Sequence, residues 1–152
     1  MCVADVFLIC NYGILPAWAL LILVPKSVWT TRVVHSMFLP VLLAAVYLTA
    51  FVANPESLRG DFGTLDGVMR LFEESWVVLA GWVHYLVFDL FVGAWEVRDA
   101  ERLEIPHLYV VPCLLVTLML GPIGLAMYLL LRFSLRRNPW LHEDRQPAPG
   151  LR

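Results

Sequence analysis

The stretch W-V-V-L-A-G-W-V-H-Y-L-V-F-D-L-F-V-G-A-W, residues 76–95, decides how the rest of the sequence is interpreted. A helix needs about 20 apolar residues to cross the hydrocarbon core of a bilayer, and this stretch has that length. Trp76 and Trp95 bracket it, as amphipathic aromatic residues do where a span meets the lipid headgroups. The stretch therefore predicts a transmembrane helix.

This helix carries three polar side chains near its middle, His84, Tyr85 and Asp89. An ionisable side chain near the bilayer centre costs about 2.5–3.5 kcal/mol on insertion scales, so it is rare unless it faces a protein interior or has a function. We therefore expect the remaining spans to form a scaffold around residues 76–95.

The composition is that of a membrane protein. The chain has 152 residues, of which 60% are hydrophobic, and a mean hydropathy of +0.72. Soluble domains have about 45–50% apolar residues. The net charge of −2 says nothing about partners, but the sequence has no basic stripe that would suit nucleic acid. Three cysteines without a C-x-x-C spacing predict neither a disulfide framework nor a zinc site.

The start of the sequence bears on the cellular location. Met1 is followed almost at once by an apolar run, without a basic segment or a clear cleavage site. No Ser- and Arg-rich transit segment precedes that run. We therefore expect an integral protein of a bacterial plasma membrane.

Apolar stretches predict an all-α bundle of four transmembrane helices in a single membrane domain, residues 1–137. The expected spans cover about 6–24, 33–52, 76–95 and 107–131. Between the second and third, Thr64 can cap a short amphipathic helix that lies in the interface. The tail, residues 138–152, has three prolines and mixed charges and is expected to be disordered.

Prolines and charges give the expected details of these spans. Pro16 and the sequence Gly121-Pro122-x-Gly124 predict kinks, and Pro40 leaves the carbonyl of Ser36 without its helical partner. The charge run 96–105 is typical of a solvated turn. Four spans place both termini on one side, and the Arg136-Arg137 pair favours the cytoplasm.

Two interpretations of Asp89 remain open from spacing alone. Tyr85 lies four residues before Asp89, so its phenol can donate to the carboxylate. His84 lies five residues before Asp89, about 140° around the helix, so the two flank a pocket only if other helices wrap that side. The groups could exchange protons as general acid and base. Alternatively, Asp89 is a packing group that holds two helices together.

A metal site would have to use the donors His84, Asp89, Asp99 and His107. His84 lies about 16 Å in depth from the end of the span, where His107 is expected. No single cluster follows, so we predict neither a metal nor a cofactor. Asp99 and His107 could instead form an interfacial pair with Arg98.

Several motifs together resemble the abscisic-acid-deficient-four-like family over about residues 11–132. The most specific is G-W-V-H-Y-L-V-F-D-L-F-V-G at 81–93. The others are R-D-A at 98–100, I-P-H at 105–107, G-P-I-G-L at 121–125, L-P-A-W at 15–18, Pro25, and T-L-D-G-V-M-R-L-F at 64–72.

The resemblance implies a small integral membrane protein. The family's plant member is associated with neoxanthin synthesis, an isomerisation of the carotenoid violaxanthin that opens an epoxide and removes a proton to leave an allene. Such a reaction needs an acid and a base but no redox cofactor. If the activity transfers, the catalytic candidates are Asp89 and His84, with Tyr85 in support. The candidates for ligand binding are Trp82, Phe88, Gly93, Asp99 and His107.

The expected partners are membrane lipid, a carotenoid or related isoprenoid, and a second copy of the chain. Two rival classes stay open. One is a non-enzymatic lipid-binding or assembly protein, and the other is a small proton-coupled carrier.

Overall fold

The computed structural model describes residues 2–52, 55, 61–137 and 139–141, and its regular structure in these ranges is helical. The helices are α1 (Val3–Gly13), α2 (Leu15–Leu23), α3 (Val28–Val33), α4 (Phe38–Val52), α5 (Leu65–Leu71), α6 (Ser75–Arg102), α7 (His107–Leu120) and α8 (Pro122–Arg136). The prediction of an all-α protein is confirmed.

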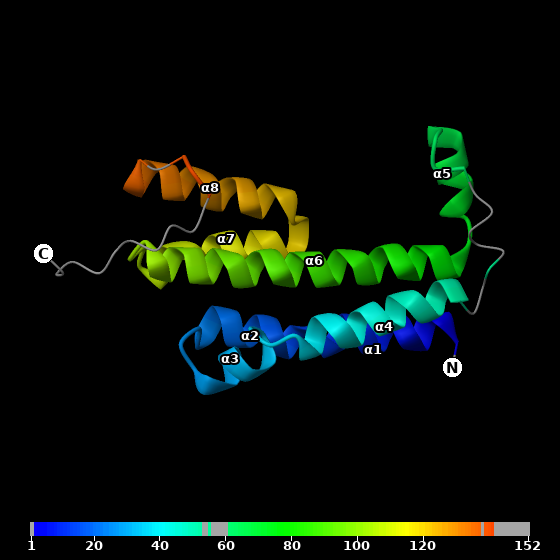
Figure 1. Cartoon of the computed structure of the whole chain (residues 1–152), viewed down its shortest axis with the longest axis horizontal. Coiled ribbons are helices and arrows are strands. Elements are labelled where there is room, and N and C mark those ends of the chain that lie inside the picture. The colour runs from blue at the N-terminus through cyan, green and yellow to red at the C-terminus, as the bar shows by residue number, and fades with distance from the viewer. Residues whose placement is uncertain (1, 53–54, 56–60, 138, 142–152) are drawn as a thin grey trace, which may run out of the picture.

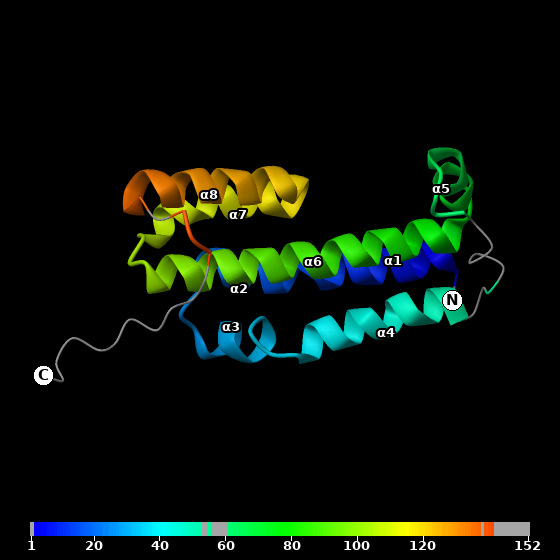
Figure 2. The same ribbon diagram turned by 45° about the horizontal axis from the view of Figure 1, so that its top comes forward.

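Helix α6 is the central element. Its 28 residues make it about 42 Å long at 1.5 Å per residue. Helix α4 runs along one side of α6 and the pair α7 and α8 along the other (Figures 1 and 2), while α1 and α2 also pack against it. Apolar side chains of α6 such as Val83, Leu90 and Val97 are buried in these contacts. The scaffold expected around residues 76–95 is therefore present.

The first predicted span, residues 6–24, is made of two helices. Helix α1 ends at Gly13, and α2 begins with Pro16 in its first turn, so the predicted break at this proline is confirmed. In the second predicted span, residues 33–52, the structure differs from the prediction, because α4 begins only at Phe38. The expected connector before it contains the short helix α3, which residues 34–37 separate from α4. Pro40 lies in the first turn of α4, where its missing N–H has no helical partner to lose.

The short helix between the second and third spans is α5. The Thr64 side chain caps it by accepting from the backbone N–H of Gly67 at 3.1 Å. Leu65, Met69 and Phe72 are exposed on or beside it. The helix and its cap are as predicted, and its place in the membrane interface stays a prediction.

The expected solvated turn at residues 96–105 is wrong for most of its length. Helix α6 does not end near Trp95 but continues to Arg102. Glu96 and Asp99 are 0% and 2% exposed, because α7 and α8 cover the face on which they lie. The charge run resembles a loop in composition, yet Glu96 and Asp99 are spaced to face a partner helix, whereas Glu101 and Glu104 are exposed.

The fourth predicted span is not one helix. Gly121 takes a φ of +31°, and the chain reverses there, so that α7 and α8 pack side by side as a hairpin (Figure 1). Gly124 allows the close approach, since a Cβ there would lie 2.1 Å from the backbone nitrogen of Thr117. Helix α7 has 14 residues, about 21 Å, which is shorter than the roughly 30 Å hydrocarbon core.

Three segments of the described chain are long and apolar enough to cross a membrane: Val3–Leu23, Val28–Val52 and Ser75–Arg102. The count of four spans is therefore not confirmed. Helix α1 begins at one end of the molecule, and α8 ends at the other end, beside the C-terminal end of α6 (Figure 1). This arrangement differs from the predicted one, with both termini on one side. Which side is cytoplasmic stays a prediction, and the tail beyond residue 141 lies outside the described residues.

Cysteine labelling in intact and lysed cells of a bacterial expression host would distinguish the hairpin from a fourth span. Cys2 is exposed at the start of α1, whereas Cys10 and Cys113 are buried. We expect an impermeant maleimide to reach Glu104→Cys and Arg137→Cys from the same side, and Cys2 from the opposite side. Cys2 and Arg137→Cys labelled together, with Glu104→Cys opposite, would indicate four spans.

Candidate functional site

Three acidic side chains lie along the face of α6 that the α7–α8 hairpin covers. Asp89, Glu96 and Asp99 are spaced by seven and three residues, which places them on one side of a helix. Their exposures are 9%, 0% and 2%. We refer to these three residues as the carboxylate ladder. Buried carboxylates are rare unless they are paired, so the partners of each one indicate its role.

Asp99 is the fully paired member of the ladder. Its Oδ2 accepts from Nε of Arg132 at 2.8 Å and from the Tyr128 hydroxyl at 2.7 Å. Its Oδ1 accepts from Arg102. Arg132 and Tyr128, both on α8, are 2% and 0% exposed. This network of ion pair and hydrogen bonds ties the end of α6 to α8.

Glu96 is only half satisfied. Its Oε1 accepts from the Thr117 hydroxyl of α7 at 3.0 Å. Its Oε2 is buried and has no hydrogen-bond partner among the described residues. An unpaired buried oxygen costs free energy, and such groups recur at functional sites.

Asp89 meets the turn of the hairpin. A Cβ at Gly121 would lie 2.7 Å from Asp89 Oδ1, so only glycine fits against this carboxylate. Oδ2 of Asp89 is buried without a hydrogen-bond partner in the described part of the chain. Tyr85, one turn earlier, donates its hydroxyl to the carbonyl of Leu118 at 2.9 Å and lies within electrostatic reach of Asp89.

His84 does not join Asp89. It is exposed on another face of α6, where its ring lies 4.5 Å from that of Phe88 and 6.3 Å from that of Tyr47 on α4, measured between centroids. Phe88 is itself 55% exposed. The two residues could flank a pocket only if other helices wrapped that side, and the neighbouring helices do not bring His84 and Asp89 together.

Trp82 and Gly93 have roles in helix packing. The indole N–H of Trp82 donates to Oδ1 of Asn11 on α1 at 3.2 Å. A Cβ at Gly93 would lie 2.8 Å from the ring of Trp18, which is 2% exposed. Gly93 thus allows α2 to approach α6 and does not line a described cavity.

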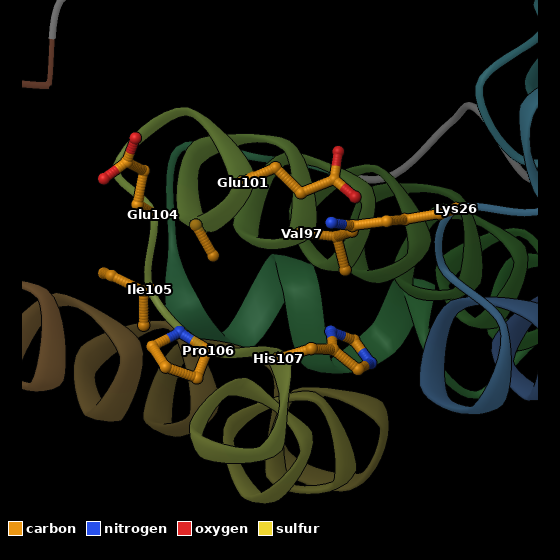
Figure 3. A pocket seen from close by; sticks show the side chains of 8 residues that line it. Lys26, Val97, Glu101, Glu104, Ile105, Pro106 and His107 are labelled. Atoms are coloured by element: carbon orange, nitrogen blue, oxygen red, sulfur yellow. The ribbon is translucent and has the colours of Figure 1, made fainter.

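The predicted interfacial trio of Arg98, Asp99 and His107 does not form. Arg98 contacts His35, and His107 Nε2 lies 3.0 Å from the carbonyl oxygen of Ile22. His107 instead lines a cavity of about 300 Å³ at the end of α6, with Lys26, Glu101 and Glu104 (Figure 3). Its lining mixes both signs of charge with apolar residues, so it suits a polar end group better than a hydrocarbon chain.

An apolar groove of about 310 Å³ lies between α6 and α8. Its lining residues are Phe91, Val92, Trp95, Leu125, Leu129 and Leu141. Val92 lies three residues after Asp89 and four before Glu96, between the two half-paired acids on one helix face. We refer to this cavity as the α6–α8 groove. Asp89 and Glu96 are not among the lining residues of the groove, but Val92, which is, lies within about one helical turn of both.

Among the described residues, no three His, Cys, Asp or Glu side chains are grouped so that they could hold a metal ion. The acids of the ladder are strung along the helix instead, since seven residues correspond to a rise of about 10 Å. The site offers separate carboxyl groups rather than one multidentate ligand set.

The interpretation of the sequence missed four members of this site: Glu96, Thr117, Tyr128 and Arg132. A signal was present, because Glu96 falls on the same stripe as Tyr85 and Asp89. Arg132 lies eleven residues after Gly121, where its sequence context is typical of an arginine that ends a transmembrane span at the headgroups. Only the reversal at Gly121 brings it back to Asp99.

The comparisons with known proteins agree with these motifs. The profile of the ABA DEFICIENT 4-like family matches residues 5–128, and the chain belongs to that family of membrane proteins. It is 26% identical over 114 residues to "Protein ABA DEFICIENT 4, chloroplastic" of Arabidopsis thaliana, and this match covers 68% of the present chain. The chain spans about half, 52%, of that relative's length. No solved structure matches.

Proposed function

We propose that the protein binds a carotenoid or related isoprenoid in the α6–α8 groove and isomerises it by acid–base chemistry at the carboxylate ladder. The observation that carries this proposal is a pair of buried oxygens, Asp89 Oδ2 and Glu96 Oε2, that have no hydrogen-bond partner within the described ranges. Both acids lie within about one helical turn of Val92, which lines the groove. Membership of the ABA DEFICIENT 4-like family supports the ligand class.

The groove suits a segment of a long apolar ligand. It is lined by aromatic and branched aliphatic side chains, and its volume of about 310 Å³ is at the low end for ligand pockets. A rod-like isoprenoid would place one segment there and leave the rest in the lipid. Trp95 forms one wall and packs edge-on against Tyr128, which in turn donates to Asp99. The contacts from Asp99 through Tyr128 therefore hold Trp95 in place as a wall of the groove.

One carboxyl group can supply both proton transfers of an epoxide-opening isomerisation. The protonated carboxyl donates its proton to the epoxide oxygen as the C–O bond breaks. The resulting carboxylate then removes a proton from the neighbouring carbon, which leaves a new C=C bond and restores the acid. No oxidant or reductant is consumed. Asp89 is our candidate for this group, because His84 points elsewhere and Tyr85 donates to Leu118.

A second candidate function is a non-enzymatic lipid-binding or assembly protein. The observation that favours it is that Asp99 and Glu96 bond to the hairpin, so part of the ladder already serves helix packing. The two functions differ in whether a bound pigment is chemically changed.

Purification from a host that makes violaxanthin tests the proposal. We expect pigment to remain with the protein in mild detergent, and the host extract to gain an isomer of unchanged mass. Leu129→Trp should reduce bound pigment severalfold by filling the groove, whereas Leu130→Trp, on the exposed side of α8, should retain it. Chromatography with mass spectrometry measures both effects.

The same experiment separates the alternatives. Bound pigment without an isomer would favour the non-enzymatic function. A colourless protein that carries only phospholipid, with an unchanged pigment profile in the host, would contradict the proposal.

A further inference from the structure

A second groove, of about 410 Å³, opens beside the break between α3 and α4. Its polar part is formed by His35, Ser36 and Arg98, and its apolar floor by Leu90, Phe91 and Ala94 of α6. We refer to it as the His35–Arg98 groove. It shares Phe91 with the α6–α8 groove but otherwise lies on another face of α6 from the carboxylate ladder, and the proposed function does not use its polar part.

The polar part of this groove presents hydrogen-bond donors. Nη1 of Arg98 lies 3.1 Å from Nδ1 of His35. A guanidinium group has no acceptor, so Nδ1 must accept, and the ring proton is then on Nε2. Arg98 keeps four further N–H groups, and a planar guanidinium suits the oxygens of a phosphate. The contact with His35 thus orients a cation at the mouth of the groove.

The start of α4 adds to the positive potential. His35 and Ser36 lie three and two residues before Phe38, the first residue of this 15-residue helix, and the Phe38 N–H donates to the Ser36 hydroxyl at 3.3 Å. A helix N-terminus favours an anion by its free N–H groups and its dipole. The opposing charge is Glu101, which lies within electrostatic reach of His35.

The depth of Arg98 matches that of lipid phosphates. It lies 23 residues after Ser75, about 35 Å along α6, which exceeds the roughly 30 Å hydrocarbon core. The floor of the groove, Leu90 to Ala94, lies up to two turns deeper, at the level of acyl chains. The cation is therefore in the interface when the floor is in the hydrocarbon.

We propose that the His35–Arg98 groove binds an anionic phospholipid, with the phosphate on Arg98 and one acyl chain along Leu90, Phe91 and Ala94. The negative charge of the headgroup complements the N–H donors of Arg98, and the acyl chain complements the apolar floor of the groove. This lipid would be a resident partner of the protein, distinct from the ligand of the α6–α8 groove.

Native mass spectrometry of the full-length protein, titrated with phosphatidylglycerol in detergent, tests this site. We expect one tightly bound lipid, with phosphatidylcholine weaker and diacylglycerol, which lacks the phosphate, weaker still. Arg98→Gln should weaken phosphatidylglycerol binding about tenfold, the effect of losing one charge-assisted contact. Arg32→Gln, an exposed cation outside the groove, should change it less than twofold. Inorganic phosphate alone should not compete, because it cannot use the apolar floor.

Several results would overturn the proposal. Equal binding of diacylglycerol would show that the headgroup is not recognised, and equal losses in Arg98→Gln and Arg32→Gln would show only diffuse attraction. Effective competition by inorganic phosphate would indicate a simple anion site. Should Arg98→Gln fail to fold, the comparison of headgroups on the wild-type protein still decides, and Arg98→Lys, which keeps the charge, should bind between the two extremes.

Discussion

Replacing Asp89 by asparagine is expected to abolish isomerisation while leaving the protein inserted, folded and pigmented. Asparagine has nearly the size of aspartate and fits against Gly121, but it cannot carry the proton that the proposed reaction transfers. General acid–base catalysis contributes about 10²–10⁴-fold to a rate, so we expect a loss of at least a hundredfold. Product formed in a violaxanthin-making host, per amount of membrane-inserted protein, is the measurement.

Two further variants make this result interpretable. Asp66→Asn removes an exposed carboxylate from α5 and should retain full activity. Asp89→Leu distinguishes a catalytic from a packing role. If Asp89 only packs helices together, this variant should keep its function, since hydrogen bonds between membrane helices average only about 0.6 kcal/mol in one well-studied case. Activity in both Asp89→Asn and Asp89→Leu would eliminate the catalytic role and leave a packing role for this residue.

The central helix could be predicted from sequence because its signals are local. Length, apolar content and the bracketing tryptophans identify residues 76–95 without knowledge of any neighbour. The Thr64 cap and the break before Pro16 are local too. Each depends on one turn of backbone, and each is present in the structure.

The hairpin at Gly121 could not be predicted in the same way. A Gly-Pro pair inside an apolar run is compatible with a kinked helix and with a reversal of the chain. The local sequence does not distinguish the two. Contacts with other residues decide: Gly121 meets Asp89, and Gly124 meets Thr117. These contacts join residues far apart in sequence, and without them a continuous span is the simpler interpretation.

The site could be predicted only in part, for the same reason. Asp89 stands out as an acid in an apolar helix, but Glu96 and Asp99 lie among other charges, a context typical of solvated residues. Their burial depends on α8 returning along α6, which brings Arg132 and Tyr128 to Asp99. Proximity in sequence suggests a pairing of His84 with Asp89, although helix geometry already places the two about 140° apart.

The second large effect concerns stability, and it follows from the ion pair between Arg132 and Asp99. Arg132→Met should destabilise the protein by about 3 kcal/mol, because it leaves a buried carboxylate with only part of its compensation. It also removes the bond from Arg132 to the carbonyl of Trp140 at 2.6 Å. Unfolding in mixed micelles, followed by tryptophan fluorescence, measures the change in free energy.

The exposed pair of Arg70 and Asp66 provides a matched control. Both pairs have an N···O distance of 2.8 Å, but the side chains are 74% exposed in the control and 2% or less in the pair between Arg132 and Asp99. Arg70→Met should therefore cost no more than about 0.5 kcal/mol. Asp99→Asn combined with Arg132→Met should regain more than half of the loss, since no buried carboxylate remains and the Arg102 side chain, which loses its ion pair with Asp99, is 30% exposed. The introduced amide oxygen still accepts from the Tyr128 hydroxyl. If Arg132→Met is no worse than Arg70→Met, the buried pair does not hold α8 against α6, and the hairpin must be retained by its other hydrogen bonds to α6 and its apolar contacts.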